Sequence, residues 1–412
     1  MTVVRIGSIQ QHKVSENRVR CLLRNVREDD GITQLYFFHI DFTDSIIQGM
    51  QKLLVRDGRR FSSIKLLSCS GNMPLVATMI MDHSSTESLT LSNSQVSAFH
   101  AVNESLRTNQ SLKVLRISGS TFLSGEAFLD GLEHNCTLKE LDMCRNHLSK
   151  CAVESLSHTL SKNQGLEILK LESCDLEDHA MAEVIRSLLN HTTLTELDLS
   201  NNAASSEALE MVAQLIQRNR IQTLSINSLL LSDELDPAIL LQAIASLQTN
   251  TSLSYLDISG NHFSDEIVQG LAKALCVNST LETLDVSESD INETGVKTFA
   301  KHLPRFSGMK VLNLAENDIT EEAALALVAG LEDNRLLQSL GPIEEVYECT
   351  HFLEHYLDLN LAGRRALQND ISLGVWPHLL ARTAKAELCC KRNENALFSL
   401  LRGPALFERE QF

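Results

Sequence analysis

The stretch Leu194-Thr-Glu-Leu-Asp-Leu-Ser-Asn-Asn202 decides the fold of this chain. Its pattern, L-x-x-L-x-L-x-x-N, places alternate leucines on one side of a short strand and ends at a polar residue. Counting Leu194 as position 1, matching stretches begin at Ile32, Phe61, Thr86, Leu112, Leu138, Leu166, Leu194, Ile221, Leu253, Leu281 and Met309. Their recurrence at about 28 residues predicts a chain of stacked repeats.

The second half of each repeat has helical spacing. Apolar residues recur every three or four positions in residues 151–160, 180–189, 267–275 and 323–331. One strand and one helix cannot bury an apolar face alone, so neighbouring repeats must stack. The sequence therefore predicts an α/β solenoid of about 11 repeats, a horseshoe with a parallel sheet on its concave side and helices on its convex side.

Position 9 of each repeat is expected to bond the backbone where the chain leaves the strand. Residues suited to this role are Asn146, Asn202, Asn261 and Asn317, with Cys69 and Cys174 as substitutes. Leu229 departs from the pattern, in the repeat with the longest interval to the next start. We therefore expect an irregular segment around residues 227–240, with Asp236-Pro237 opening a helix.

These repeats resemble the ribonuclease-inhibitor class of leucine-rich repeats. The resemblance is carried by the period and by segments such as Asn190-His-Thr-Thr-Leu-Thr-Glu-Leu-Asp-Leu-Ser200, and it covers residues 31–341. It implies the horseshoe fold and says little about function. Residues 1–30 are expected to form an N-terminal helical cap, with an amphipathic helix over residues 16–26.

Residues 342–412 leave the repeat pattern and are predicted to form a C-terminal helical extension or cap, with a helix over residues 344–361. The motifs Leu-Asn-Leu-Ala-Gly-Arg-Arg (359–365), Trp376-Pro377 and Leu-Leu-Arg-Gly-Pro-Ala-Leu (400–406) resemble the C-terminal extension of leucine-rich-repeat proteins from diatoms. Two interpretations remain open. The segment is either a cap packed around Trp376 or a docking module for a second partner.

The composition restricts the partners and the compartment. The formal net charge of −17 argues against nucleic acids and anionic membranes, since both attract basic proteins. Neither a secretory signal nor a membrane span is evident, and the scattered cysteines indicate a reducing compartment, so we expect a cytoplasmic or nuclear protein. Asn-x-Ser/Thr sequences such as those at Asn135, Asn250 and Asn278 are interpreted as repeat consensus and not as glycan sites.

The strongest candidate for catalysis is His351-Phe-Leu-Glu-His355, which resembles the inverted zinc-peptidase motif. That family needs a further ligating Glu far downstream, and few residues remain here, so a chance pattern on a cap helix is favoured. The sequence contains no phosphate-binding loop, no C-x-x-C pair and no nucleophile elbow. We therefore predict no metal, no cofactor and no enzymatic activity.

Side chains alternate across a strand, so positions 3, 5 and 7 should face the concave side. An apolar patch is expected first and a track of acids beyond it, including Glu172 and opposed only by Arg145 and Lys170. The predicted partner-binding residues are Tyr36, Phe38, Leu67, Glu140, Asp142, Glu196, Asp198, Tyr255, Asp257, Asp285, Glu288 and Glu316. Such a face would suit a basic protein, unless the acids are consensus residues and the cap covers the aromatic side chains.

The predicted function is a monomeric scaffold that binds another protein on its concave face. Three alternatives are a GTPase-activating regulator like the Ran activators, a substrate receptor of a ubiquitin ligase, and a zinc hydrolase using His351 and His355. The chain lacks the acidic tail of the Ran activators and an F-box-like segment, which disfavours the first two.

Overall fold

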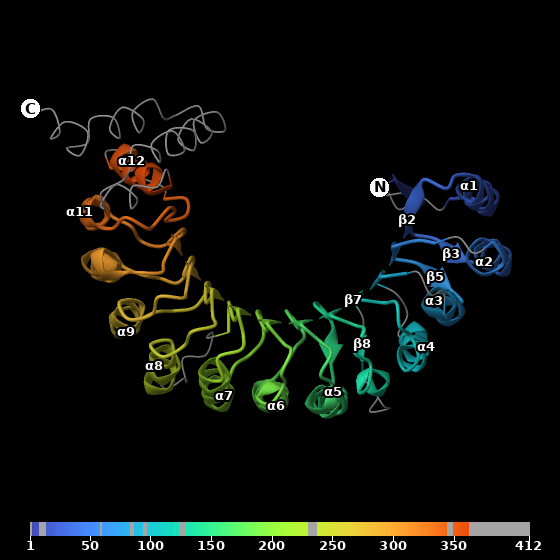
Figure 1. Ribbon diagram of the computed structural model, residues 1–412, viewed down its shortest axis with the longest axis horizontal. Coiled ribbons are helices and arrows are strands. Elements are labelled where there is room, and N and C mark those ends of the chain that lie inside the picture. Colours follow the sequence, from blue (N-terminus) through green and yellow to red (C-terminus); the bar gives the residue numbers. More distant parts are fainter. Residues whose placement is uncertain are drawn as a thin grey trace, which may run out of the picture. The chain divides into compact units, whose positions relative to one another are not determined.

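The computed structural model describes residues 2–7, 14–57, 60–82, 86–93, 97–119, 121–122, 129–229, 237–343 and 349–361. The chain divides into two compact units, Met1–Leu215 and Ile216–Phe412, here called the N-terminal and C-terminal units. In both, parallel strands follow one another in sequence order and helices lie on one side of them (Figure 1). The structure is therefore the predicted α/β repeat solenoid.

The N-terminal unit contains eight strands of the long parallel sheet. They are β1 (Thr2–Gly7), β2 (Ile32–Phe38), β4 (Ser63–Leu67), β6 (Ser88–Ser92), β7 (Val114–Ser118), β9 (Glu140–Asp142), β11 (Ile168–Lys170) and β12 (Glu196–Asp198). Equivalent positions pair across the sheet, so that Tyr36 lies beside Lys65, and Arg116 beside Asp142. This register brings the same repeat position of neighbouring strands into one row.

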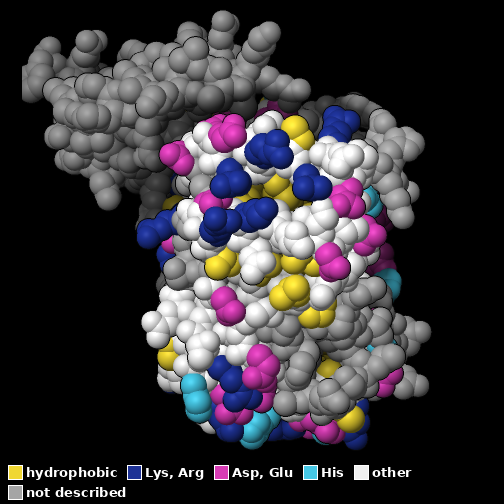
Figure 2. All heavy atoms as spheres, turned by 90° about the vertical axis from the view of Figure 1, so that its right-hand side faces the viewer, with side chains coloured by type: hydrophobic (Ala, Val, Ile, Leu, Met, Phe, Trp, Pro, Cys, Tyr) yellow, Lys and Arg dark blue, Asp and Glu magenta, His cyan; other side chains and the backbone are white. Residues whose placement is uncertain are grey.

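The helices of this unit cover one face of the sheet. They are α1 (Glu16–Glu28), α2 (Asp44–Gln51), the π-helical turn η1 (Lys52–Arg56), α3 (Met73–Asp82), α4 (Ser97–Leu106), the 3₁₀ turn η2 (Asp130–Leu132), α5 (Lys150–Lys162), α6 (Asp178–Leu188) and α7 (Ser206–Gln217). Two short two-stranded parallel sheets lie outside the main sheet. One pairs β3 (Asp41–Phe42) with β5 (Ser70–Gly71), and the other pairs β8 (Thr121–Phe122) with β10 (His147–Leu148). Figure 2 views the end of the unit where α1 and α2 lie.

The C-terminal unit repeats the arrangement with four strands: β13 (Thr223–Ser225), β14 (Tyr255–Asp257), β15 (Thr283–Asp285) and β16 (Val311–Asn313). Its helical elements are α8 (Pro237–Ser246), α9 (Asp265–Leu275), α10 (Glu293–His302), the 3₁₀ turn η3 (Leu303–Arg305), α11 (Glu321–Asp333) and α12 (Thr350–Leu361). After β16, Ser339 forms one parallel bridge with Val311. Of the helices in the described ranges, none has both the length and the apolar composition that crossing a membrane requires.

The core lies between the strands and the helices. In the Leu194 repeat, Leu197 and Leu199 at positions 4 and 6 are fully buried, and Leu209 of α7 is buried as well. Each fully buried leucine contributes about 2 kcal/mol to the free energy of folding. The predicted helices over residues 151–160, 180–189, 267–275 and 323–331 are confirmed as α5, α6, α9 and α11.

Two predictions at the chain's irregular points have different outcomes. Helix α8 begins at Pro237, as expected, while residues 230–236 lie outside the described residues. The amphipathic helix of the first thirty residues is α1, with Val19, Leu23 and Val26 buried. The cap is not only helical, however, because β1 pairs with β2 and extends the sheet. This part of the chain is therefore a strand followed by a helix, as in a repeat.

Position 9 links successive repeats as predicted. Asn202 donates from Nδ2 to Leu171 O (2.9 Å) and Leu199 O (2.8 Å), and its Oδ1 accepts the N–H groups of Cys174 and Leu176. The Cys174 thiol substitutes for an amide by donating to Met143 O at 3.0 Å. These bonds satisfy backbone groups that a buried turn would otherwise leave unpaired.

A second asparagine ladder lies three residues before position 1. Asn278 donates to Leu247 O (2.7 Å) and accepts from Leu281 N (2.8 Å). Asn135 and Asn250 make equivalent bonds, and all three are buried. The side chains at these Asn-x-Ser/Thr sequences are therefore part of the fold, which confirms their interpretation as repeat consensus.

Position 8 has a positive φ in all eleven repeats. The residues are His39, Ser68, Asn93, Gly119, Arg145, Ser173, Asn201, Ser228, Gly260, Glu288 and Glu316. Most carry a side chain in this left-handed conformation, which costs about 1–2 kcal/mol. In return the ladder continues past the strand, because the N–H of position 8 donates to a carbonyl of the next repeat. This carbonyl is usually at position 7, as from Ser173 to Ser200 at 2.9 Å, whereas Gly119 donates to Arg145 at position 8.

Candidate functional site

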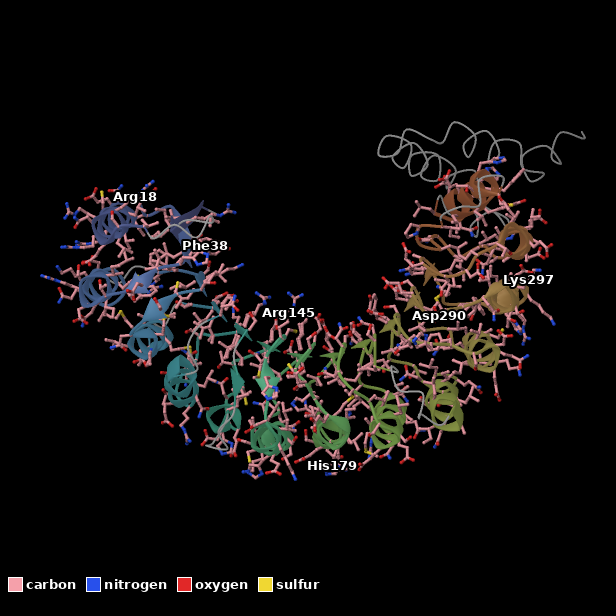
Figure 3. All side chains as sticks on the ribbon, turned by 180° about the vertical axis from the view of Figure 1, so that it is seen from behind. Arg18, Phe38, Arg145, His179, Asp290 and Lys297 are labelled. Atoms are coloured by element: carbon pink, nitrogen blue, oxygen red, sulfur yellow. The ribbon has the colours of Figure 1, made fainter. Side chains whose placement is uncertain are left out.

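The face of the sheet away from the helices is called the strand face here. Side chains at positions 3 and 5 lie on it half-buried, as predicted, for example Glu196 and Asp198. Figure 3 shows Phe38 and Arg145 on this side of the ribbon, and His179 and Lys297 on the helix side. Position 7 is less regular than expected, because Ser200 and Ala315 are buried.

The predicted apolar patch is a contiguous cluster in the N-terminal unit. Phe38 of β2 pairs in register with Leu67 of β4, and Tyr36 pairs with Lys65. The Lys65 ammonium lies 4.7 Å from the centroid of the Tyr36 ring, a cation–π distance, and the Tyr36 hydroxyl donates to Gln34 Oε1 at 2.8 Å. Neighbouring side chains therefore fix the ring of Tyr36 in one position.

Helix α1 does not cover this cluster. It packs its buried residues Val19, Leu23 and Val26 on the helix side, while Tyr36, Phe38 and Leu67 remain half-buried on the strand face. In the described residues, the edge strand β1 lies beside β2 and places Arg5 next to Tyr36. The row Arg5–Tyr36–Lys65 therefore gives this end of the strand face an aromatic and basic character.

The acidic track of the N-terminal unit is partly neutralised. Arg116 Nη2 lies 2.6 Å from Glu140 Oε1, and its Nε lies 3.7 Å from Asp142 Oδ2. Lys170 Nζ lies 2.8 Å from Glu196 Oε1, and this hydrogen bond raises the pKa of the Lys170 ammonium. The expectation that only Arg145 and Lys170 oppose the acids was therefore wrong, since Arg116 also faces them.

The aspartates at position 5 stabilise the turn that follows each strand. The Oδ1 atoms of Asp198, Asp257 and Asp285 each accept the backbone N–H two residues later at 3.0 Å. In the C-terminal unit the second oxygens are also engaged, since Asn227 donates to Asp257 and Asn313 to Asp285. The consensus interpretation therefore accounts for these aspartates.

The remaining predicted residues of the C-terminal unit are less engaged by neighbouring side chains than Asp257 and Asp285 are. Glu288 and Glu316 occupy position 8 of neighbouring repeats and are exposed, with no ion pair to any residue in the described ranges. Tyr255 lies half-buried at position 3 of β14, beside Thr223 and Thr283. Acidic character on this part of the strand face therefore rests on the two glutamates.

The structure brings together one group of possible metal ligands that was not predicted from the sequence. The ligand atoms of Cys144, Glu172 and Asp198 lie within 4.8 Å of one another on three adjacent repeats. A thiolate with two carboxylates is a ligand set that Zn²⁺ accepts. Burial and the nearby Asp142 raise the pKa of the Cys144 thiol, so the sulfur retains its proton at neutral pH. Only the repeat register brings these residues together, so linear spacing could not reveal them.

The H-x-x-E-H segment lies on α12. His351 is exposed, and the described residues do not bring it together with Glu354 and His355 as a three-ligand group. The other options for ligands, from Glu387 onward, lie outside the described residues, as does Trp376. The zinc-hydrolase alternative gains no support from this helix.

Comparisons with known proteins agree with the repeat architecture. A family model described as Leucine Rich repeat matches residues 190–213, 249–272 and 277–300. Among curated proteins, the chain is 27% identical over 179 residues to NACHT, LRR and PYD domains-containing protein 14 of Mus musculus, covering 43% of this chain and 18% of that protein. It is 30% identical over 169 residues to protein 13 of the same series in Homo sapiens, covering 40% and 15%. The chain thus spans less than a fifth of these relatives.

Two solved structures are also similar. An internalin from Listeria monocytogenes covers 81% of this chain and 78% of its own, with 15% identity and a TM-score of 0.45. The second actin-binding site of leiomodin-1 covers 38% and 89%, with 18% identity and a TM-score of 0.34. With the parallel strand order and the asparagine ladders described above, the family match leads to one conclusion: the chain is a leucine-rich-repeat protein.

Proposed function

We propose that this chain is a non-catalytic scaffold that binds another protein on its strand face, with Tyr36, Phe38 and Leu67 as the anchor. The observation that carries the proposal is the half-buried aromatic cluster on β2 and β4, where Lys65 and Gln34 hold the Tyr36 ring. Large aromatic side chains fixed on a rigid sheet lose little entropy on binding and often dominate interface energies.

The proposed partner is a protein that presents an apolar knob to this cluster. In the N-terminal unit, the row Arg5–Tyr36–Lys65 supports a partner whose surface around the apolar knob is acidic or neutral. The exposed Glu288 and Glu316 support a basic partner surface in the C-terminal unit. We further propose that the protein is a monomer and that it is located in the cytoplasm or nucleus. Thiols such as Cys69 and Cys174, which form no disulfide, support the location in a reducing compartment.

Affinity purification from cells that make the protein, followed by mass spectrometry, tests the proposal. The wild-type chain is compared with the Tyr36→Ala/Phe38→Ala variant. The matched control is Val277→Ala/Leu325→Ala, which truncates two exposed apolar side chains outside the strand face. We expect the anchor variant to lose its partner, with about tenfold or greater loss of affinity for the purified pair, and the control to retain it.

Thermal unfolding of each variant separates lost binding from lost structure. A partner recovered equally with the wild type and the anchor variant would show that the aromatic cluster is not the anchor. A copurified small GTPase whose hydrolysis the chain accelerates would instead support the regulator alternative, and copurified ligase subunits would support the receptor alternative.

A further inference from the structure

The outer surface of α1 and η1 carries a group of basic side chains that we call the basic helix face. It consists of Arg20, Arg24, Arg27, Lys52 and Arg56, all of which are exposed. Figure 2 shows Lys and Arg side chains gathered over this end of the N-terminal unit, with apolar side chains close by. The basic helix face lies on the helix side and is therefore separate from the strand face.

Helix geometry aligns the three arginines. Arg20, Arg24 and Arg27 are four and three residues apart, so they lie on one stripe of α1. The neighbouring stripe contains Val19 and Leu23, which are buried. The packing of α1 therefore fixes the direction in which the arginine stripe points.

The π-helical turn η1 carries two further bases, Lys52 and Arg56, and its end is linked to the end of α1. The Asp57 N–H donates to Lys52 O at 2.9 Å, the i to i+5 bond of a π-helix. The Asp57 carboxylate then pairs with the Arg27 guanidinium, which joins the end of η1 to the end of α1. Val55, within the turn, is 62% exposed. The result is a basic surface with an apolar side chain at its edge.

Bases elsewhere in the N-terminal unit are mostly neutralised by acids. The pairs include Lys113–Glu87, Lys139–Glu167, Lys162–Glu133, Lys170–Glu196 and Arg186–Glu207. By contrast, Arg20, Arg24, Lys52 and Arg56 form no ion pair with any residue that the structure describes. The five bases outnumber the exposed acids of the same elements, which are Glu16, Glu28 and Asp57. In a chain of net charge −17, this local surface is therefore positive.

We propose that the basic helix face binds an acidic helical segment of a partner protein. Guanidinium groups bind carboxylates through two parallel N–H donors, and four of the five bases are arginines. Carboxylates four residues apart on a helix are about 6 Å apart along its axis, the axial spacing of Arg20 and Arg24. Val55 supplies an apolar contact. Nucleic acids and anionic membranes favour a broadly basic protein, and the remainder of this chain would repel them.

Fluorescence anisotropy with a defined probe tests this proposal. The probe is a labelled alanine-based helical peptide of about 17 residues that carries Glu every fourth residue, and its reference is the same peptide with Gln. The full chain is compared with Arg20→Glu/Arg24→Glu/Arg56→Glu. The matched control is Lys273→Glu/Lys301→Glu/Arg305→Glu, which reverses three exposed bases that have no ion pair in the described part of the C-terminal unit.

We expect the wild type and the control to bind the Glu peptide, with affinity that falls as salt rises, and neither to bind the Gln peptide. The face variant should bind at least about tenfold more weakly. If the control variant loses as much affinity for the Glu peptide as the face variant, the loss follows from net charge alone and the proposal is overturned. Unchanged affinity of the face variant would also overturn it. Tighter binding of a DNA duplex or of vesicles rich in phosphatidylserine would also overturn it. Circular dichroism of both variants confirms that they are folded.

Discussion

At the scale of single residues, the asparagine at position 9 determines whether a turn can be buried. The Asn202 side chain makes hydrogen bonds with backbone groups of its own and the preceding repeat. Asn202→Ala leaves the N–H groups of Cys174 and Leu176 without acceptors in a buried turn. We expect a loss of about 2–4 kcal/mol in the free energy of unfolding, measured by urea denaturation.

The control for this change is Glu210→Ala, which truncates an exposed side chain of α7 in the same repeat. It should alter the free energy of unfolding by less than about 0.5 kcal/mol. Equal stability of Asn202→Ala and Glu210→Ala would mean that water replaces the amide and that the ladder contributes little.

The buried thiols give a prediction about pH. Burial raises the pKa of the Cys69 thiol to about 11 and that of Cys174 to about 12. Because the folded protein holds these protons more tightly than the unfolded chain, the stabilisation is complete below pH 9 and is lost as the pH rises toward 11. We expect the urea midpoint to fall over this window, and less steeply in Cys69→Ala.

The same shift predicts which thiols react. The thiolate is the nucleophile, so Cys69 and Cys174 should be alkylated at pH 8 at least about a hundredfold more slowly than exposed Cys21, Cys136 and Cys151. Peptide mapping after brief iodoacetamide treatment measures each site separately. Rapid labelling of Cys174 in the folded protein would contradict its burial.

At the scale of secondary-structure elements, caps define where the helices begin. Thr320 precedes α11; its Oγ1 accepts from Ala323 N at 3.2 Å and donates to Glu293 Oε2 at 2.7 Å. We expect Thr320→Ala to cost about 1 kcal/mol, measured as a lower unfolding midpoint. Thr320→Ser keeps the hydroxyl and should recover most of the loss. If Ser and Ala behave alike, the methyl group of Thr320 and not its hydroxyl is responsible.

Helices were easier to predict from the sequence than strands. Apolar spacing identified α5, α6, α9 and α11, because one helix face must be buried whatever its neighbours are. The strand length was not predictable. The repeats at Phe61 and Thr86 match the pattern poorly but form five-residue strands, whereas the well-matched Leu194 repeat forms three. Strand pairing depends on the neighbouring strands, which a local pattern does not describe.

At the scale of the whole molecule, the register between repeats decides which charged side chains of the strand face are engaged by neighbouring repeats and which remain available to a partner. The sequence placed Tyr36 and Asp198 on the correct face, because side chains alternate along a strand. It could not show that Arg116 reaches Glu140, or that Asn227 of the preceding repeat donates to Asp257, because these contacts depend on three-dimensional pairing. Reversing Asp198 and Asp257 would therefore disturb the fold as well as any binding.

The exposed glutamates of the C-terminal unit give a cleaner test of acidic recognition. Glu288 and Glu316 occupy left-handed position 8, where Arg145 shows that a long basic side chain also fits. We expect Glu288→Lys/Glu316→Lys to weaken binding of a labelled oligo-arginine peptide by about tenfold at low salt, measured by calorimetry. Glu266→Lys/Asp333→Lys makes the same charge change on exposed residues of α9 and α11, and it should weaken binding by less than twofold. If both variants lose the same affinity, the peptide senses only net charge, and the strand face of this unit does not recognise basic partners.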